Sequence, residues 1–448
     1  MINRNPLPPF PSLILLILLC MLTMSSCDSN EIVKITFSYG QDDDGSIAAM
    51  IQEFNMTHEG EIAVEFKEGK RLSNQFYDEL SVDFSVGGSD VDVWGADVVW
   101  TALFATKGWA EDLTDRFNQV FHNHDFIDAS IKSATYDDKI WGIPWFTEAG
   151  LLYYRKDLLQ KHGIQDPPRT WEELVSITNR VKQDDSGVLH GFVFQADAYE
   201  GGVVNACEFI WNAGGELIVG DVLESGIFQS VKVDADIIAV NSLEAEEGLA
   251  VAARLVREKV CPSKVDSYRE FESLENFMDG KCLFMRGWPA VYGEFMRPGA
   301  SVTADMVGVA ALPTVLESNP SFSCLGGWNL MINASATEAR KEASWKFILY
   351  LTDPASQQYR LERAGTLPSL KSLYNDADLA QKVPILQATK TVILNARSRP
   401  TSPYYMEMSP FISTVFQSVV RRTLSPRNAV SDLEVHLEKF LDEHKLPS

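Results

Sequence analysis

Residues 34–66 read KITFSYGQDDDGSIAAMIQEFNMTHEGEIAVEF, and this stretch decides the fold class. Residues 34–39 alternate apolar and polar side chains, as a strand with one buried face does. Four apolar residues then follow at the spacing of one helix face: Ile47, Met50, Ile51 and Phe54. Residues 62–66 return to the pattern of a strand. A strand, a helix and a second strand in this order predict an α/β fold with a largely parallel sheet.

The same alternation continues along the chain. The sequence TWEE at residues 170–173 is a capping box, which predicts the start of a helix. An Asp-Pro pair at residues 353–354 predicts another helix start, and Gly365 predicts where that helix ends. Residues 267–278 predict a helix with one apolar stripe, formed by Tyr268, Phe271, Leu274 and Met278.

The start of the chain resembles an export signal followed by a lipid attachment site. Arg4 precedes an apolar stretch at residues 13–22, which is roughly half of what a membrane-spanning helix needs. The signal ends in MSSC, which resembles a bacterial lipobox, where the cysteine is acylated. We expect residues 1–26 to be removed and residues 27–31 to form a tether lipidated at Cys27. Secretion without a lipid is the alternative.

The remaining chain is too long for one hydrophobic core. Of 448 residues, about 420 would remain after export, and single cores usually stop growing at roughly 250–300 residues. No internal repeat and no low-complexity linker divides the sequence. We therefore expect two lobes, between which the chain crosses more than once.

Net charge restricts the classes of partner. The formal charge is −23, and it becomes −24 when Arg4 leaves with the signal. Binding to nucleic acid relies on Lys and Arg that neutralise phosphates. The acidity argues against nucleic acid and against an anionic membrane surface as the main ligand. We expect contact with the membrane through the lipid alone.

Four cysteines remain after the signal and the lipid site: Cys207, Cys261, Cys282 and Cys324. An oxidising exterior permits disulfides, but four cysteines allow three pairings and the sequence does not choose among them. Their wide spacing matches no zinc site. Either at least one bridge forms, or the thiols stay buried and free.

No familiar catalytic motif is present. The chain lacks glycine-rich phosphate loops, HExxH, CxxC and GxSxG. His122 and His124 fit a solvated loop better than a metal site, so we expect no metal and no other cofactor. Aromatic planes cover the C–H faces of sugars, and charged groups bond to their hydroxyls. Five segments combine such residues: 92–100, 141–154, 284–292, 326–328 and 397–405.

A family resemblance begins in WGIPWFTEAGLLYYRKDLL at 141–159, which includes one of these segments, and in PPRTWEEL at 167–174. They resemble the extracellular sugar-binding proteins of ABC importers, in particular the trehalose/maltose-binding branch of the family 1 solute-binding proteins. The similarity spans nearly the whole mature chain. It continues through DVVW at 97–100, YEG at 199–201, GWP at 287–289, GGWN at 326–329 and RPTSPYY at 399–405.

The resemblance implies two α/β lobes joined by a hinge, with the ligand held in the cleft between them. It places chain crossings near residues 142–144, 304–307 and 365–368. The first lobe would then comprise residues 32–143 and 306–366, and the second lobe residues 144–305 and 367–448.

The resemblance also implies a set of ligand contacts. Asp97 and Glu148 would accept hydrogen bonds from sugar hydroxyls, although Glu148 stands where close relatives have Asp. Trp288 and Trp328 would stack on sugar rings, and Gly327 would offer a backbone amide.

Three further positions belong to the implied site. Arg399 matches a guanidinium that bonds two sugar oxygens, with an anchoring salt bridge as its alternative role. Phe146 stands where Tyr is common, which would remove one hydroxyl contact. Asp43 is the implied acid of the first strand-to-helix loop, where Asp44 fits a shifted register; Glu200 is a weaker candidate.

The implied function is capture of a di- or oligosaccharide by a monomer, outside the cytoplasmic membrane. A sugar that touches both lobes would stabilise the closed form, which would deliver it to an ABC permease. No bond is made or broken in this mechanism. The alternatives are an exported glycoside hydrolase, a binding protein without a transporter, and a receptor for a non-sugar solute on the same lobes.

Overall fold

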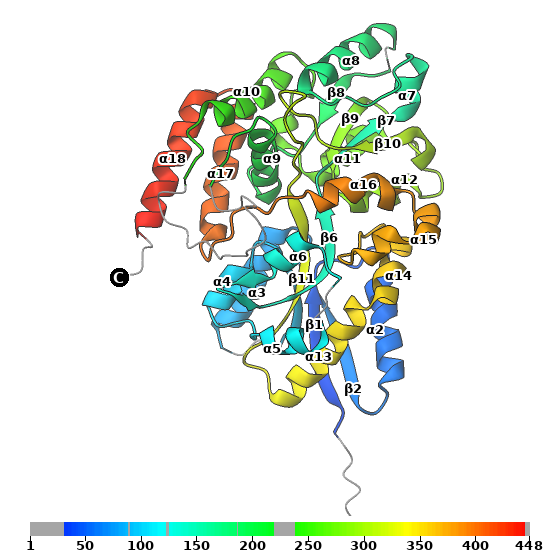
Figure 1. Cartoon of the computed structure of the whole chain (residues 1–448), viewed down its shortest axis with the longest axis vertical. Coiled ribbons are helices and arrows are strands. Elements are labelled where there is room, and N and C mark those ends of the chain that lie inside the picture. The colour runs from blue at the N-terminus through cyan, green and yellow to red at the C-terminus, as the bar shows by residue number, and fades with distance from the viewer. Residues whose placement is uncertain (1–30, 88–89, 122–124, 186, 219–237, 444–448) are drawn as a thin grey trace, which may run out of the picture.

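The computed structural model describes residues 31–87, 90–121, 125–185, 187–218 and 238–443. The predicted signal peptide, Cys27 and the His122–His124 pair lie outside these residues. Two large sheets, each flanked by helices, form two lobes that lie one above the other in Figure 1. The α/β class and the two-lobed architecture are therefore confirmed, but the expectation of a largely parallel sheet is wrong, because both sheets are mixed and contain antiparallel pairs.

The first lobe is built on a five-stranded sheet with the order β2-β1-β3-β11-β6. Its strands are β1 (Val33–Tyr39), β2 (Ile62–Glu68), β3 (Val93–Asp97), β6 (Ile143–Ala149) and β11 (Leu325–Ile332). Strand β1 is parallel to β2 and β3, whereas β11 is antiparallel to β3 and β6. Strands β1, β3 and β6 therefore point the same way and end at one edge of the sheet.

Helices follow these strands as the sequence pattern predicts. Helix α2 (Ser46–Thr57) buries the four apolar residues that defined its face, Ile47, Met50, Ile51 and Phe54. The other helices of this lobe are α3 (Ser73–Ser85), α4 (Thr101–Thr106), α5 (Thr114–Val120), α6 (Asp128–Ser133), α13 (Glu338–Thr352) and α14 (Pro354–Ala364). A small hairpin joins β4 (Thr135–Tyr136) to β5 (Lys139–Ile140).

The second lobe is built on a four-stranded sheet with the order β10-β7-β9-β8. Its strands are β7 (Leu151–Arg155), β8 (His190–Val193), β9 (Cys282–Gly287) and β10 (Val307–Ala310). The longer helices around it are α8 (Trp171–Asp184), α9 (Glu200–Trp211), α10 (Leu243–Arg257), α11 (Glu270–Met278), α17 (Tyr405–Val420) and α18 (Pro426–Glu443). Two shorter helices of this lobe are α7 (Lys156–Lys161) and α12 (Tyr292–Phe295). Helices α15 (Ala377–Lys382) and α16 (Ile385–Leu394) follow later in the chain and bury their apolar residues in the core of the first lobe.

Two predicted helix boundaries are confirmed by their capping bonds. The Thr170 side chain accepts a hydrogen bond from the Glu173 backbone N–H and opens α8. Asp353 accepts from the Ala355 backbone N–H and opens α14, which ends at Gly365 in the left-handed conformation. The helix expected at residues 267–278 begins only at Glu270, so Tyr268 of the expected apolar stripe lies before it in extended backbone. Phe271 is also wrong as a stripe residue, because it is 70% exposed.

The chain passes between the sheets later than the resemblance implied. Strand β6 stays in the first sheet through Ala149 and enters β7 of the second sheet at Gly150, not near residues 142–144. The second passage lies between β10 and β11, at residues 311–324. Residues Leu367 and Ser369 still accept hydrogen bonds from first-lobe backbone N–H groups, so the third passage follows them. The lobe boundaries expected at 143/144, 305/306 and 366/367 therefore all lie later in the chain.

The lobes also meet through apolar side chains. One continuous buried cluster extends from Trp94 and Trp100 of the first lobe to Phe209 and Tyr405 of the second. The four cysteines Cys207, Cys261, Cys282 and Cys324 are free and buried, which decides between the two alternatives left by the sequence. Within the described ranges, no helix combines the length and apolar character that a membrane crossing requires.

Candidate ligand-binding site

The predicted contacts gather where β1, β3 and β6 end. Ligands of α/β proteins commonly bind beside the carboxyl ends of parallel strands. In the sheet register, Asp97 of β3 lies opposite Trp328 of β11, and Trp328 lies opposite Phe146 of β6. One row across three strands thus brings an acid and two aromatic rings together. Glu148 lies opposite Gly326, two residues away from Phe146 and Trp328 along the same pair of strands.

Asp97 is a buried carboxylate at the end of β3. One oxygen accepts hydrogen bonds from the Arg399 guanidinium at 3.2 Å and from the Val99 backbone N–H at 3.3 Å. The other oxygen accepts from the Ser73 hydroxyl at 2.7 Å. Burial raises the pKa of Asp97, while Arg399 acts in the opposite direction. Its bonds hold this carboxylate in a fixed orientation.

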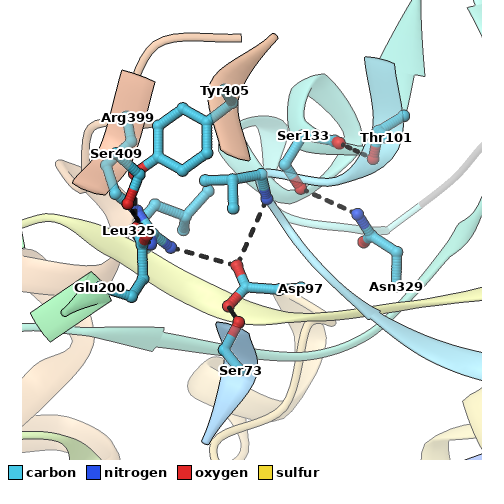
Figure 2. Close-up of polar contacts among 11 residues, drawn as sticks. Ser73, Asp97, Thr101, Ser133, Glu200, Leu325, Asn329, Arg399, Tyr405 and Ser409 are labelled. Atoms are coloured by element: carbon cyan, nitrogen blue, oxygen red, sulfur yellow. Dashed lines mark hydrogen bonds and ion pairs between the residues drawn. The ribbon is translucent and has the colours of Figure 1, made fainter. Parts of the chain in front are cut away.

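Arg399 joins the two lobes through a buried ionic cluster, which Figure 2 shows in close-up. Its guanidinium is paired with Asp97 of the first lobe and with Glu200, the first residue of α9 in the second lobe. Glu200 also accepts hydrogen bonds from the Tyr405 hydroxyl and from the Ser409 hydroxyl. The arrangement matches the anchoring salt bridge that the sequence left open for Arg399. Its Nε–H has no partner among the described residues.

Trp328 is the centre of an aromatic group on the first lobe. Its ring packs edge-on against Tyr39 with centroids 5.0 Å apart, and against Trp100 at 5.4 Å. The preceding residue, Gly327, has a φ of 113°, and a Cβ there would lie 2.4 Å from the Phe146 carbonyl oxygen. Only glycine fits this approach of backbone to backbone, which keeps Trp328 and Phe146 in register.

Trp288 brings a second indole ring from the other lobe. It follows β9, and its ring lies so close to Gly326 that a Cβ there would meet it at 2.8 Å. The Arg286 guanidinium stacks on the Trp288 ring, with its central carbon 3.9 Å from the ring centroid. Arg286 is itself bound by both oxygens of Glu208, at 2.8 and 2.9 Å.

Glu148 connects β6 with the turn after Trp288. Its carboxylate receives a hydrogen bond from the Ala290 backbone. Burial raises the pKa of Glu148 from 4.5 to about 7, and the charges of Arg286 and Arg360 lower it only in part. The carboxyl group is therefore able to act as a donor or as an acceptor near neutral pH.

The first strand-to-helix loop separates its acidic residues. Asp43 is exposed and forms a two-bond ion pair with Arg71, at 2.7 and 2.8 Å. Asp44 instead lies within electrostatic range of Tyr39 and Arg360 at the strand ends. The electrostatic interactions of Asp44 with Tyr39 and Arg360 favour the register in which Asp44, rather than Asp43, belongs to the site.

Sequence reasoning missed several residues of this region. Tyr39 contacts Trp328 and Phe146, and its pKa is raised by burial in an environment that includes Arg360, Glu148 and Asp97. Its position as the last residue of a strand was a usable signal. Arg360 belongs to α14 and carried no comparable signal, because it stands among other polar residues of an amphipathic helix.

The assembled groups suit binding of a polyhydroxylated molecule. Two indole rings, a phenyl ring and a tyrosine offer apolar planes, while Asp97, Glu148 and the backbone offer hydrogen-bonding groups. Within the described part of the chain, no group of three or more His, Cys, Asp and Glu side chains is arranged to hold a metal ion.

Comparisons with known proteins agree with this geometry. The profile of the family described as bacterial extracellular solute-binding protein matches residues 49–387. A probable ABC transporter-binding protein of Deinococcus radiodurans is 33% identical over 358 residues, which cover 79% of this chain and 80% of that protein. The galactooligosaccharide-binding protein of Bacillus subtilis is 24% identical and covers 79% of this chain and 77% of its own.

A solved structure of a sugar-binding protein is also similar to this chain. The maltose-bound MalE3 of T. maritima superposes with a TM-score of 0.80 at 32% identity, covering 91% of this chain and 100% of that one. Relatives and structural neighbours of this kind are substrate-binding proteins. The chain therefore belongs to the bacterial extracellular solute-binding proteins, which serve ABC importers as receptors for sugars and polyols and are not enzymes.

Proposed function

We propose that this protein is the lipid-anchored receptor of an ABC sugar importer and that it binds a di- or oligosaccharide of the maltose or trehalose type. The observation that carries the proposal is the row Asp97–Trp328–Phe146 at the strand ends, faced by Trp288 from the other lobe. The maltose complex of the 32% identical neighbour supports this class of ligand.

Each group has a role in this proposal. Trp288 and Trp328 stack on sugar rings from opposite lobes, and Phe146 widens the apolar plane. Asp97 and Glu148 accept hydrogen bonds from hydroxyls, and the Gly327 backbone supplies a polar contact. Arg399 acts mainly by joining Asp97 to Glu200, with its Nε–H left to donate to the ligand. Asp43 has the weakest claim because it is exposed and paired.

Closure of the hinge couples binding to delivery. The sugar contacts both lobes, so it stabilises the form in which they are closed, and the permease recognises that form. Only differential affinity for the closed form can shift this equilibrium. Contacts from both sheets, through Trp328 and Trp288, supply such a difference.

A thermal-shift screen tests the proposal. A ligand at 100 times its Kd stabilises the folded state by about 2.7 kcal/mol, which raises the Tm by several degrees. We expect maltose or trehalose to produce this shift, and Trp288→Ala to abolish it. Phe271→Ala, an exposed aromatic of the same lobe, is the matched control and retains the shift. If mannitol alone shifts the Tm, the ligand is a polyol and the disaccharide assignment is wrong.

The membrane anchor is tested separately. Cys27→Ser removes the acylation site, so the variant is expected in the soluble extracytoplasmic fraction while the wild type sediments with membranes. Equal distribution of the two proteins would show that the chain is secreted without a lipid. A pull-down with candidate ABC permease subunits, with and without maltose, tests delivery.

A further inference from the structure

Arg360 is a buried arginine at the junction of the lobes. It belongs to α14, and only 6% of its surface is exposed. The end of the same helix approaches the second lobe, where the Ala364 carbonyl oxygen lies 3.5 Å from the position of a Cβ on Gly293. Arg360 thus occupies the border across which a bound sugar would lie.

The guanidinium of Arg360 lacks the partners that burial normally requires. Its Nε and Nη1 atoms are buried and make no hydrogen bond within the part of the chain that the structure describes. A buried charge without hydrogen bonds costs several kcal/mol, so buried arginines are usually paired. A buried arginine without hydrogen bonds therefore indicates either a ligand-binding group or a local cost in stability that the fold tolerates.

Aromatic faces hold this guanidinium in place. Its carbon lies 4.0 Å from the Trp145 ring centroid and 4.7 Å from that of Phe146. Stacking orients a planar guanidinium and leaves the N–H groups at its rim free to donate. The predicted contact Phe146 therefore packs directly against Arg360.

Acceptors lie around Arg360 without bonding to it. Asp42, Asp44, Glu148 and the Tyr39 hydroxyl are all within electrostatic range. Asp42 is occupied, because both of its oxygens accept backbone N–H groups at the start of α2. Asp44 accepts one backbone bond, from Ser46. The surroundings therefore offer free acceptors as well as free donors.

We propose that Arg360 is a ligand-binding residue that donates hydrogen bonds to two adjacent hydroxyl oxygens of an uncharged sugar. The Tyr39 hydroxyl and the Asp44 carboxylate receive hydroxyl protons of the same ring, which lies against Phe146. This assignment rests on the proposed function and adds a subsite on the α14 side of the first lobe.

Charge decides the class of ligand. Glu148, Asp42 and Asp44 all interact with Arg360, so a sugar carboxylate or phosphate bound there would face three acids. A neutral vicinal diol meets the free N–H groups without this repulsion. The subsite therefore favours neutral sugars over uronates and phosphosugars.

The test compares Arg360→Met and Arg360→Lys with wild type. Methionine keeps the apolar contact with Trp145 and removes the unpaired charge, so we expect the Tm of the ligand-free protein to rise by a few degrees. The Kd for maltose, or for trehalose where trehalose binds more tightly, is expected to rise at least about tenfold, as for the loss of a charged hydrogen bond. Lysine keeps the charge but cannot donate to two oxygens in one plane, so it weakens binding without raising the Tm.

Arg257→Met, which removes an exposed arginine of α10, is the matched control and changes neither quantity. A Kd for Arg360→Met within twofold of wild type, with Trp288→Ala inactive, would overturn the subsite and leave the proposed function standing. Glucuronate or glucose 6-phosphate binding more tightly than maltose would overturn the neutral class. No binding of any sugar by wild type would overturn the proposed function, and the subsite with it.

Discussion

The two sheets bury charge in different ways. Inside the second lobe, Arg286 binds both oxygens of Glu208, and the Cys324 backbone N–H adds a third bond to that carboxylate. At the strand ends of the first lobe, Arg360 and Arg399 keep buried nitrogens without a partner within the described residues. Buried polar groups are normally satisfied, and the exceptions gather at functional sites.

The difference separates structural charge from functional charge. A closed pair such as Arg286–Glu208 fixes one packing arrangement, and breaking it leaves an uncompensated charge. Arg399 is anchored by Asp97 and Glu200, whereas the Nε and Nη1 atoms of Arg360 make no hydrogen bond within the described residues and remain available to a ligand. Substitutions at Arg286 and at Arg360 should therefore have opposite effects on the stability of the ligand-free protein.

The largest expected effect is at Arg286. Arg286→Met leaves the Glu208 carboxylate buried and unpaired, so we expect a loss of about 3–5 kcal/mol in the free energy of unfolding. Urea denaturation of the ligand-free protein measures it. The double variant Arg286→Met with Glu208→Gln should recover much of the loss. A single-variant loss below about 1 kcal/mol would contradict the view that this pair is structural.

Glu148 should make stability depend on pH. Its pKa is raised from 4.5 to about 7, mainly by burial, so the folded state holds a proton that the unfolded state releases. The stabilising contribution is complete below about pH 4.5 and is lost as the pH rises through about 7. At 1.36 kcal/mol per pKa unit, the loss is on the order of 3 kcal/mol.

The measurement is the unfolding free energy of wild type and Glu148→Gln at pH 5 and pH 7.5. The Gln variant cannot ionise, so its advantage over wild type should be small at pH 5 and grow toward pH 7.5. A difference between the two proteins that stays constant with pH would mean that Glu148 is ionised throughout the range.

Gly150, where the chain passes from β6 to β7, should tolerate no side chain. A Cβ there would lie 2.0 Å from Glu208 Oε1 and 2.7 Å from Arg286 Nη2, so Gly150→Ala must displace the ion pair. We expect a loss of about 2 kcal/mol, within the range for overpacked cores. Gly40→Ala is the control, since its Cβ would meet nothing closer than 3.6 Å. Equal stabilities of the two variants would show that the pair can move at little cost.

The sequence predicted the elements better than the places where they cross. Helix α2 and the capped starts of α8 and α14 follow from local patterns. The first crossing, which the resemblance placed near residues 142–144, lies at Gly150. Pro144 instead lies in an edge strand beside a register shift, where a missing N–H is tolerated. The need for glycine at 150 depends on Glu208, which is distant in sequence.

In the candidate site as well, residues in local motifs could be predicted and residues placed by long-range packing could not. Asp97, Trp328 and Phe146 could be named because each belongs to a short motif that resembles the family, and the sheet register then places the three in one row. Arg360 could not, since the sequence of α14 gives it the same setting as the exposed Arg363. Only packing against Trp145 and Phe146, more than two hundred residues earlier in the chain, buries one and not the other.

The smallest expected effects concern the acids of the first loop, where sequence reasoning could not choose a register. Asp43 is exposed and held by Arg71, and exposed ion pairs contribute at most about 1 kcal/mol to stability. Asp43→Asn should therefore leave the Kd for maltose within twofold of wild type. Asp44→Asn should raise that Kd severalfold, because Asp44 lies toward Tyr39 and Arg360. Titration calorimetry of both variants decides which of the two acids contacts the ligand. A larger effect for Asp43→Asn than for Asp44→Asn would assign the contact to Asp43.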